Sequence, residues 1–228
     1  MDETQQLLHR NRSSVSDGKE TSVKAGGWEH LSVAVTQLGR VAHNRGWTPA
    51  TSGNFSAVAS WNPLVLAISP SGVNKGSMVA EQVLRIEEGG DPISGGPRPS
   101  AEAALHLAVV RSVRPAFVAH THSLWGTLAS VRHARRGGVA IRNYELLKGL
   151  AGVQSHDHEE WIPIIENSQD WHADAHRVEE ILRSTPGLHA FLIRGHGLYT
   201  WGGSLAEVER HLEALEFLLE VVGRLDSP

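Results

Sequence analysis

Two histidines, His120 and His122, follow directly on the apolar run formed by residues 116–119. A short apolar run of this kind predicts a buried strand. Successive side chains of a strand point to opposite faces of the sheet, so His120 and His122 point the same way. Two imidazoles on one face at the end of a strand can chelate one divalent metal ion. The chain is therefore expected to build a sheet that carries a metal site at a strand end.

A third histidine, His196, lies between two glycines and follows the apolar run 190–193. Three histidines with one open coordination position are what a catalytic zinc ion needs. The chain has 14 histidines, and any single one is more often a hydrogen-bonded core residue. The same-face pair together with a third histidine in a glycine-flanked loop nevertheless favours metal binding. Zinc suits nitrogen ligands, and iron, cobalt or manganese stay open as alternatives.

The composition excludes several other kinds of site. The formal net charge is -4 and no stripe of Lys and Arg is present, which argues against a nucleic-acid partner. The chain has no cysteine, so disulfides and cysteine-based metal sites are excluded. No apolar stretch approaches the roughly 20 residues that a membrane helix requires, and a cytoplasmic protein is expected. Residues 1–25 are predicted to be a disordered tail, and residues 26–228 a single catalytic domain.

Helical and strand patterns are mixed along the chain without strict alternation. Apolar residues at helical spacing predict helices over residues 28–45, 100–111, 123–132, 144–150, 173–183 and 204–225. Apolar runs predict strands over residues 55–59, 64–68, 82–86, 116–122, 161–165, 188–193 and 198–201. This mixture predicts an α/β chain of the α+β type, in which helices cover a central, mainly antiparallel sheet.

Five short motifs occur in a fixed order, at residues 51–54 (TSGN), 69–72 (SPSG), 99–102 (PSAE), 120–123 (HTHS) and 194–197 (RGHG). Their order and spacing resemble the class II aldolase and adducin superfamily from about residue 28 to residue 223. Residues 144–149 (YELLKG) and 161–167 (WIPIIEN) resemble the methylthioribulose-1-phosphate dehydratases within that superfamily. The resemblance implies a class II aldolase-like three-layer fold, a homotetramer, and one Zn²⁺ per subunit.

The resemblance also implies a binding site for a phosphorylated ketose. The motifs at residues 51–54, 69–72 and 99–102 supply hydroxyl, amide and backbone N–H groups, which suit an anion. Ser100 is expected to cap a helix, and an anion is favoured at such a helix N-terminus. Taken one by one these are ordinary turn residues. Lys75 nearby is expected to be a solvated lysine, and an approach to the phosphate is the alternative. In sugar-phosphate aldolases the matching positions hold the phosphate, and here they are Ser52, Gly53, Asn54, Ser71, Gly72 and Ser100.

Two carboxylates compete for the acid/base role. Glu102 matches the catalytic glutamate of the sugar-phosphate aldolases, and Glu145 matches the general acid/base of the dehydratases. We expect Glu145 to be the main acid/base and Glu102 to contact the metal or the substrate. Lys148, one turn after Glu145, is expected to form an ion pair with it. The second closely spaced pair of histidines, at residues 156 and 158, lies in a polar stretch and is expected at the surface.

The implied activity is that of a hydro-lyase of methionine salvage. It would dehydrate S-methyl-5-thioribulose 1-phosphate to a 2,3-diketo-5-methylthiopentyl 1-phosphate. A metal ion held by the three histidines would polarise the C2 carbonyl and acidify the C3 hydrogen. Glu145 would remove that proton and then protonate the departing C4 hydroxyl. The alternatives are a class II sugar-phosphate aldolase or epimerase, with Glu102 as the acid/base, and a non-catalytic interaction module like the adducin head, which lacks the metal histidines.

Overall fold

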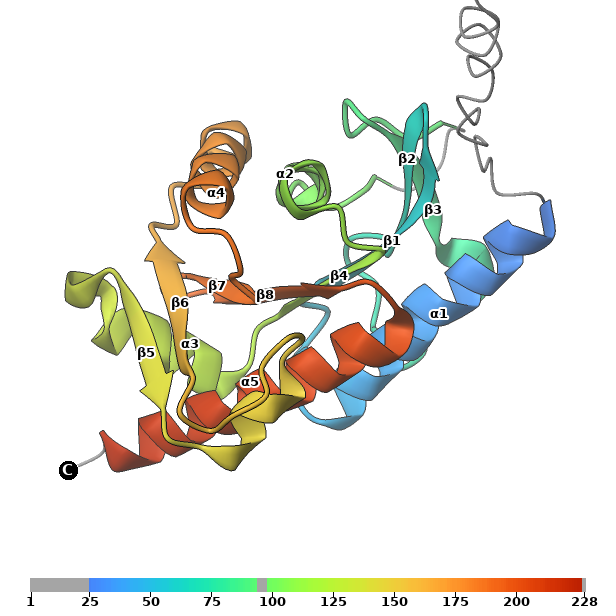
Figure 1. Cartoon of the computed structure of the whole chain (residues 1–228). Helices are drawn as coiled ribbons and strands as arrows, with labels where there is room; N and C mark the ends of the chain where they lie inside the picture. Colours follow the sequence, from blue (N-terminus) through green and yellow to red (C-terminus); the bar gives the residue numbers. More distant parts are fainter. Residues whose placement is uncertain (1–24, 94–97, 227–228) are drawn as a thin grey trace, which may run out of the picture.

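The computed structural model describes residues 25–93 and 98–226, and its centre is one eight-stranded sheet (Figure 1). The strand order is β3-β2-β1-β4-β8-β7-β6-β5, and all neighbours are antiparallel except β6 and β7. The prediction of a mainly antiparallel sheet is confirmed. The strands are β1 (Asn54–Trp61), β2 (Leu64–Ile68), β3 (Leu84–Glu87), β4 (Phe117–Thr121), β5 (Gly138–Arg142), β6 (Glu159–Ile165), β7 (Ala190–Ile193) and β8 (Gly197–Gly202).

Helices cover both faces of the sheet. Figure 1 shows α2 and α4 side by side on one face, and α1, α3 and α5 on the other. The helices are α1 (Ala25–Asn44), α2 (Ala103–Val113), α3 (Leu124–Arg132), α4 (Trp171–Ser184) and α5 (Leu205–Leu225), with 3₁₀ turns η2 (Ala80–Gln82), η3 (Ala134–Arg136) and η4 (Glu145–Gly149). This is the expected three-layer arrangement. Among the helices that the structure describes, none is long and apolar enough to cross a membrane.

Each face of the sheet has its own hydrophobic core, and the central strand β4 contributes to both. Val118 packs in the core beneath α2 and α4, whereas Ala119 packs in the core beneath α1 and α5. The next two residues continue the alternation: His120 faces the α2 and α4 side, and Thr121 faces α5. The period of two along β4 therefore directs His120 toward the N-terminal end of α2.

The structure differs from the sequence predictions at the start of α2 and at β5. Helix α2 begins at Ala103 with Glu102 as its N-cap residue, so the prediction that Ser100 caps the helix is wrong. The Ser100 hydroxyl accepts a hydrogen bond from the Glu102 N–H within a turn that precedes the helix. Strand β5 was not predicted, because its pairing with β6 is a long-range contact that its own residues do not indicate. Of the predicted tail, only Ala25 lies in the described part of the chain, where it begins α1.

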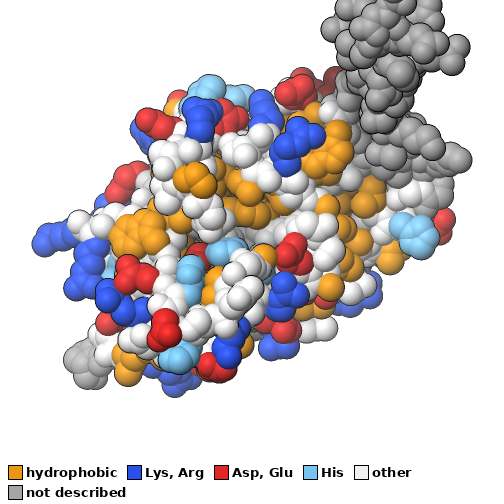
Figure 2. All heavy atoms as spheres, viewed as in Figure 1, with side chains coloured by type: hydrophobic (Ala, Val, Ile, Leu, Met, Phe, Trp, Pro, Cys, Tyr) orange, Lys and Arg blue, Asp and Glu red, His pale blue; other side chains and the backbone are white. Residues whose placement is uncertain are grey.

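Figure 2, drawn from the same side, shows Lys and Arg side chains interspersed with Asp and Glu side chains over this face. Hydrophobic side chains lie between them in small groups. Single exposed apolar side chains are normal on a folded protein, so this face alone does not mark a binding surface. The histidines that the sequence predicts as metal ligands lie instead where β4, β8 and the start of α2 meet.

Candidate functional site

The structure brings together the three histidines that the sequence predicted as metal ligands. His120 is the penultimate residue of β4, His122 directly follows the strand, and His196 lies in the turn between β7 and β8. The His122 Nε2 atom lies 2.9 Å from the Nε2 atoms of both other rings, and those two lie 3.3 Å apart. Ligand nitrogens about 2.0–2.1 Å from a tetrahedral zinc ion are separated by roughly 3.3 Å. Three ring nitrogens at this spacing cannot all satisfy one another by hydrogen bonding, whereas one shared cation satisfies them all.

Glu102 adds a carboxylate to this histidine cluster. Its Oε2 atom lies 3.1 Å from the Nε2 atom of His120, and its Oε1 atom lies 3.3 Å from that of His196. The four side chains each place a ligand atom within 4.8 Å of the others. Nitrogen donors with one carboxylate suit zinc and other divalent transition metals. The side chains present therefore fit a divalent metal ion.

The protonation state of the rings also suits a metal. The His120 Nδ1 atom lies 3.0 Å from the Leu198 carbonyl, to which it donates a hydrogen bond, and this leaves the Nε2 lone pair directed at the cluster. Burial, together with the neighbouring His120 and His196, lowers the pKa of His122 to about 3. His122 is therefore neutral at pH 7, as a metal ligand must be.

Glu102 is held in place by donors from the sheet. Asn54 Nδ2 and the Tyr199 hydroxyl donate to its Oε2 atom at 2.8 and 3.0 Å, and the Tyr199 ring stacks on His120 with centroids 4.0 Å apart. Burial raises the pKa of Glu102, but the charge and hydrogen bond of a protonated His120, together with hydrogen bonds from His196 and Asn54, outweigh burial and hold the pKa well below its usual range. Glu102 is therefore an ionised acceptor with its lone pairs largely engaged.

Behind Glu102 lies a buried polar chain that sequence reasoning missed. His106 on α2 hydrogen-bonds to Asn54 through Nε2 and to the Ser56 hydroxyl through Nδ1, and burial lowers its pKa to about 3. In the sheet, Asn54 pairs with His120 and His120 pairs with Tyr199. These residues meet only through pairing between distant strands, so no local signal in the sequence could have indicated them.

A cavity of about 210 Å³ opens beside the histidine cluster. Gly53, with φ +75°, lies so close to β4 that a Cβ atom would come within 2.8 Å of the His120 carbonyl oxygen. Glycine is therefore required at this position, where the loop approaches β4. All six residues predicted to bind phosphate line this cavity, and Glu102 and His122 join it to the histidine cluster. The lining residues are Thr51, Ser52, Gly53, Asn54, Pro70, Ser71, Gly72, Lys75, Ser100, Glu102 and His122.

Lys75 is not a solvated lysine, so that prediction is wrong. Its side chain is fully buried, and Nζ donates to the carbonyls of Thr51 at 3.1 Å and Val73 at 2.8 Å. Burial lowers the pKa of Lys75 to about 8, although the charge of Glu102 acts in the opposite direction. At neutral pH the cavity therefore contains a buried cation, which suits a phosphate group.

Glu145 does not join the histidine cluster. Its side chain on η4 is 72% exposed and forms the predicted ion pair with Lys148. Its other carboxylate oxygen lies 3.9 Å from Nδ1 of His156, which is itself exposed, as predicted. The glutamate of the Pro-Ser-Ala-Glu motif is therefore the one that lies among the metal-ligand candidates.

One further side chain borders the cluster and another lies behind it across the sheet, and the sequence analysis missed both. Trp171, the first residue of α4, packs against His196 with ring centroids 5.9 Å apart. Glu216 on α5 lies on the opposite face, where it accepts a 2.7 Å hydrogen bond from the Thr121 hydroxyl, and burial raises its pKa to about 7. Both contacts join residues that are far apart in the sequence, so spacing in the sequence gives no hint of them.

Comparisons with known proteins agree with this geometry. The family described as "Class II Aldolase and Adducin N-terminal domain" matches residues 33–222. Methylthioribulose-1-phosphate dehydratase of Sorangium cellulosum is 41% identical over 192 residues, which are 83% of this chain and 90% of that protein. The protein of the same name from Parvibaculum lavamentivorans is 44% identical over 187 residues, 81% of this chain and 89% of that protein.

Solved structures share the fold. YgbL from Escherichia coli superposes with a TM-score of 0.73 at 24% identity, covering 88% of this chain and 92% of that one. L-Fuculose-1-phosphate aldolase from Thermus thermophilus superposes with a TM-score of 0.67 at 23% identity, covering 87% and 97%. The predicted three-layer fold is thus confirmed, and the chain belongs to the class II aldolase and adducin family.

Proposed function

We propose that this protein is a metal-dependent hydro-lyase that dehydrates S-methyl-5-thioribulose 1-phosphate in methionine salvage, in the cytoplasm. Curated relatives of that name, at 40–44% identity over most of the chain, support this assignment. The structural observation that carries it is the shared focus of three histidine Nε2 atoms beside a cavity rich in hydroxyl and N–H groups.

His120, His122 and His196, with Glu102 beside them, would hold one divalent cation per subunit. The nitrogen-rich donor set favours Zn²⁺. A cation bound there supplies a Lewis acid that polarises the substrate carbonyl. The low pKa of Glu102 and its four polar neighbours make it a poor base, so its role would be to orient the histidines and balance the charge of the ion.

The cavity would hold the substrate phosphate. Its serine hydroxyls and backbone N–H groups donate hydrogen bonds, and Lys75 supplies the positive charge. With the phosphate on C1 anchored there, C2 and C3 lie toward Glu102 and His122, where the cavity meets the cluster. The methylthio end would then extend past His196 toward Trp171, and an aromatic ring is a favourable neighbour for a thioether sulfur.

Glu145 would carry the proton transfers. It removes the proton from C3, and the C4 hydroxyl leaves as water after it receives that proton. The resulting enol ketonises to the 2,3-diketone, so the overall change is the loss of one water molecule. Within one chain Glu145 lies at the surface, and it therefore has to reach the site of another subunit.

A homotetramer would provide that approach. Glu145 lies at the edge of a shallow surface hollow together with Tyr144, Leu146 and Phe217, and the side chains of Leu146 and Phe217 are 39% and 53% exposed. Aromatic and large aliphatic side chains that are exposed together favour a protein interface. A neighbouring subunit seated there would cover the apolar side chains and place Glu145 beside its own metal centre.

Product identification tests the proposal. Purified protein is incubated with S-methyl-5-thioribulose 1-phosphate, and the products are analysed by mass spectrometry before chelation, after chelation, and after Zn²⁺ is restored. We expect a product lighter by one water molecule, which disappears with the metal and returns with it. The nearest alternative is a sugar-phosphate aldolase or epimerase, which the position of Glu102 in the cluster favours. Two carbon fragments, or an isomer of unchanged mass, would establish that alternative.

A further inference from the structure

A second group of titratable side chains lies behind η4 and has no part in the proposed reaction. His189, which precedes β7, directs Nδ1 at both carboxylate oxygens of Glu160, at 3.0 and 3.1 Å. Its Nε2 atom lies 2.8 Å from the carbonyl oxygen of Ala151. His211 on α5 completes the group, with its ring centroid 5.4 Å from that of His189. Glu160 and His211 are both 2% exposed, so this network is buried.

The hydrogen-bond partners fix the charge of His189. Both of its ring nitrogens face acceptors, a carboxylate on one side and a backbone carbonyl on the other. Both nitrogens must therefore donate, which only the imidazolium form can do. The buried Glu160 carboxylate supplies the compensating negative charge, as a buried cation requires.

The partners of His211 require the opposite state. Its Nε2 atom accepts a 2.9 Å hydrogen bond from the Ala151 N–H, and its Nδ1 atom lies 2.7 Å from the Trp201 carbonyl. His211 is thus neutral, with its proton on Nδ1. Burial lowers its pKa, in agreement with this geometry.

Together the two rings hold both backbone polar groups of Ala151, the second residue after η4. Arg210 adds a 2.8 Å hydrogen bond to the Gly149 carbonyl, so α5 holds the end of η4 at two points. The packing there is tight, because a Cβ atom on Gly149 would lie 3.0 Å from the Cβ atom of Ala214. The N-terminal end of η4 is held differently: its N-cap residue, Tyr144, makes no side-chain capping hydrogen bond but packs against the core, and the preceding Asn143 N–H donates to the His156 carbonyl.

We propose that His189 and His211 are positioning residues that clamp Ala151 and thereby hold η4 and its Glu145 in place. This inference rests on the proposed catalytic role of Glu145. Cationic His189 binds the carbonyl, neutral His211 binds the N–H, and Glu160 holds His189 in its charged form. Glu145 is six residues before the clamped position, and its ion-pair partners in the described part of the chain, Lys148 and His156, are themselves exposed.

The clamp depends on pH through His189. The groups that face it are Glu160 and His158 at β6, and His211 and Glu207 on α5. Burial opposes the charged form of His189, but the hydrogen bond and charge of Glu160 outweigh it and raise its pKa above 6.5. A raised pKa means that the stabilisation is complete below pH 6.5 and is lost as the pH rises through the folded-state value. The Ala151 carbonyl then loses its donor.

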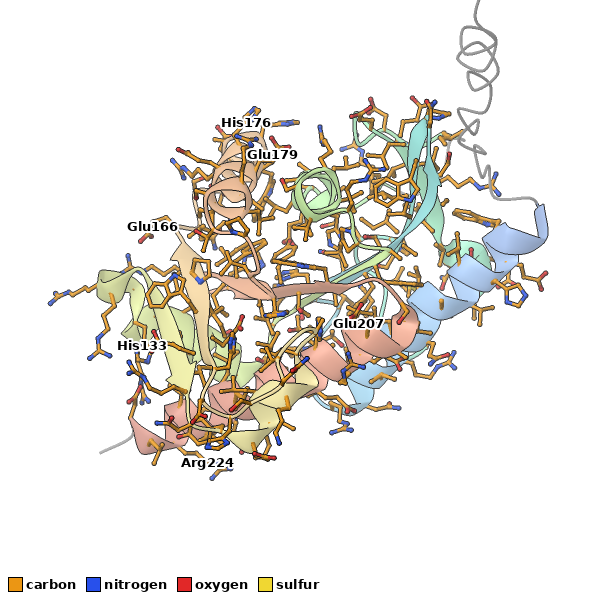
Figure 3. The ribbon with its side chains drawn as sticks, in the orientation of Figure 1. His133, Glu166, His176, Glu179, Glu207 and Arg224 are labelled. Carbon is orange, nitrogen blue, oxygen red and sulfur yellow. The ribbon has the colours of Figure 1, made fainter. Side chains whose placement is uncertain are left out.

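Hydrogen–deuterium exchange of the metal-loaded protein tests the clamp without relying on turnover. His189→Leu removes both donors, His189→Gln keeps one, and His176→Gln on the outer side of α4 is the control, because that ring is 85% exposed (Figure 3). In His189→Leu, peptides spanning residues 145–153 should lose roughly tenfold in protection, whereas peptides from β4 and β8 and the metal content stay unchanged. His189→Gln should lie between the two. The wild-type protection of this segment should fall with rising pH, and that of His189→Leu should not.

Steady-state kinetics then separate the clamp from the role of Glu145. If the clamp positions Glu145, kcat of His189→Leu falls by roughly tenfold at unchanged KM, in step with the lost protection. Unchanged protection at residues 145–153, or equal loss across the whole chain, would overturn the clamp. Local loss of protection with unchanged kcat would overturn its positioning role. Full activity of Glu145→Gln would instead remove the proposed role of Glu145 and leave the exchange result standing.

Discussion

The candidate metal centre and the η4 surface differ in how completely one chain builds them. His120, His196 and Glu102 are 0%, 9% and 13% exposed, and each contacts another member of the cluster. Glu145 is 72% exposed, and within residues 25–93 and 98–226 its carboxylate forms ion pairs with Lys148 and His156. One chain therefore brings together the groups that would bind metal and phosphate, whereas the proposed acid/base lies at an exposed surface.

In the proposed function, folding of one chain would form the metal and phosphate sites, and assembly of subunits would add the acid/base. The candidate metal ligands are positioned by burial and by hydrogen bonds that involve β1, β4 and β8, so their geometry is set once the chain has folded. The η4 surface leaves Leu146 and Phe217 exposed beside the carboxylate, so it would be completed by a neighbouring subunit. Variants in the two regions should consequently fail in different ways.

The largest effect is expected at the metal centre. His122→Ala removes a ligand candidate that lies 2.9 Å from both other ring nitrogens. We expect loss of bound metal and a fall in kcat/KM of roughly a thousandfold or more, because several kcal/mol of Lewis-acid stabilisation disappear. Metal analysis and turnover measure this, with His176→Gln as the histidine control. A variant that is fully active without bound metal would contradict the proposed metal role, and the cluster would then be structural.

Glu145→Gln should also be severe, but with the metal retained. Loss of a general acid/base lowers kcat by roughly a hundredfold or more. If Glu145 acts in a neighbouring subunit, mixed oligomers of His122→Ala and Glu145→Gln chains should recover activity. Roughly a quarter of the sites would pair an intact cluster with an intact glutamate, for random assembly of a closed ring. No recovery from a verified mixed oligomer would place both groups in one chain or leave Glu145 outside the reaction.

The sequence predicts well those features that depend only on residues close together in the chain. The two histidines at the end of β4 follow from strand alternation, and the turns around Gly53 and Gly72 follow from the chemistry of tight loops. The N-cap of α5 is equally local, because the Ser204 hydroxyl accepts from the N–H of Glu207. The three histidines meet as predicted because each lies at or beside the end of an apolar run.

The failures involve contacts between distant parts of the chain. Lys75 is buried because the carbonyls of Thr51 and Val73 accept from it, and a lone lysine in a sequence gives no sign of such partners. Strand β5 exists because β6 pairs with it. The exposure of Glu145 belongs to the same class, since a motif match indicates a role but not which chain supplies the neighbouring groups.

A smaller effect is expected for Glu102→Gln, which keeps the shape of the side chain and removes its charge. The Glu102 carboxylate contacts His120 and His196, so its loss should weaken metal binding by about 10–100-fold. The measurement is zinc affinity by competition with a chelator. At saturating zinc, kcat should largely recover, in contrast to Glu145→Gln. If kcat stays low when the site is saturated, Glu102 is the acid/base and the aldolase-like alternative gains support.

The smallest effect is expected at the phosphate cavity. Lys75 is charged below its pKa of about 8 and neutral above it, so the cavity should lose its cation, and kcat/KM should fall, as the pH rises through that value. Lys75→Met removes the charge at all pH values, so we expect kcat/KM lower by roughly tenfold at pH 7, with kcat nearly unchanged. The fall near pH 8 should be absent from the variant.

The two carbonyl acceptors that Lys75→Met leaves without a donor lower stability by about 1–3 kcal/mol, so the assays are run well below the melting temperature of the variant. A variant with the wild-type pH profile would show that Lys75 only ties Thr51 to Val73, and that the hydroxyl and N–H groups of the cavity bind phosphate without it.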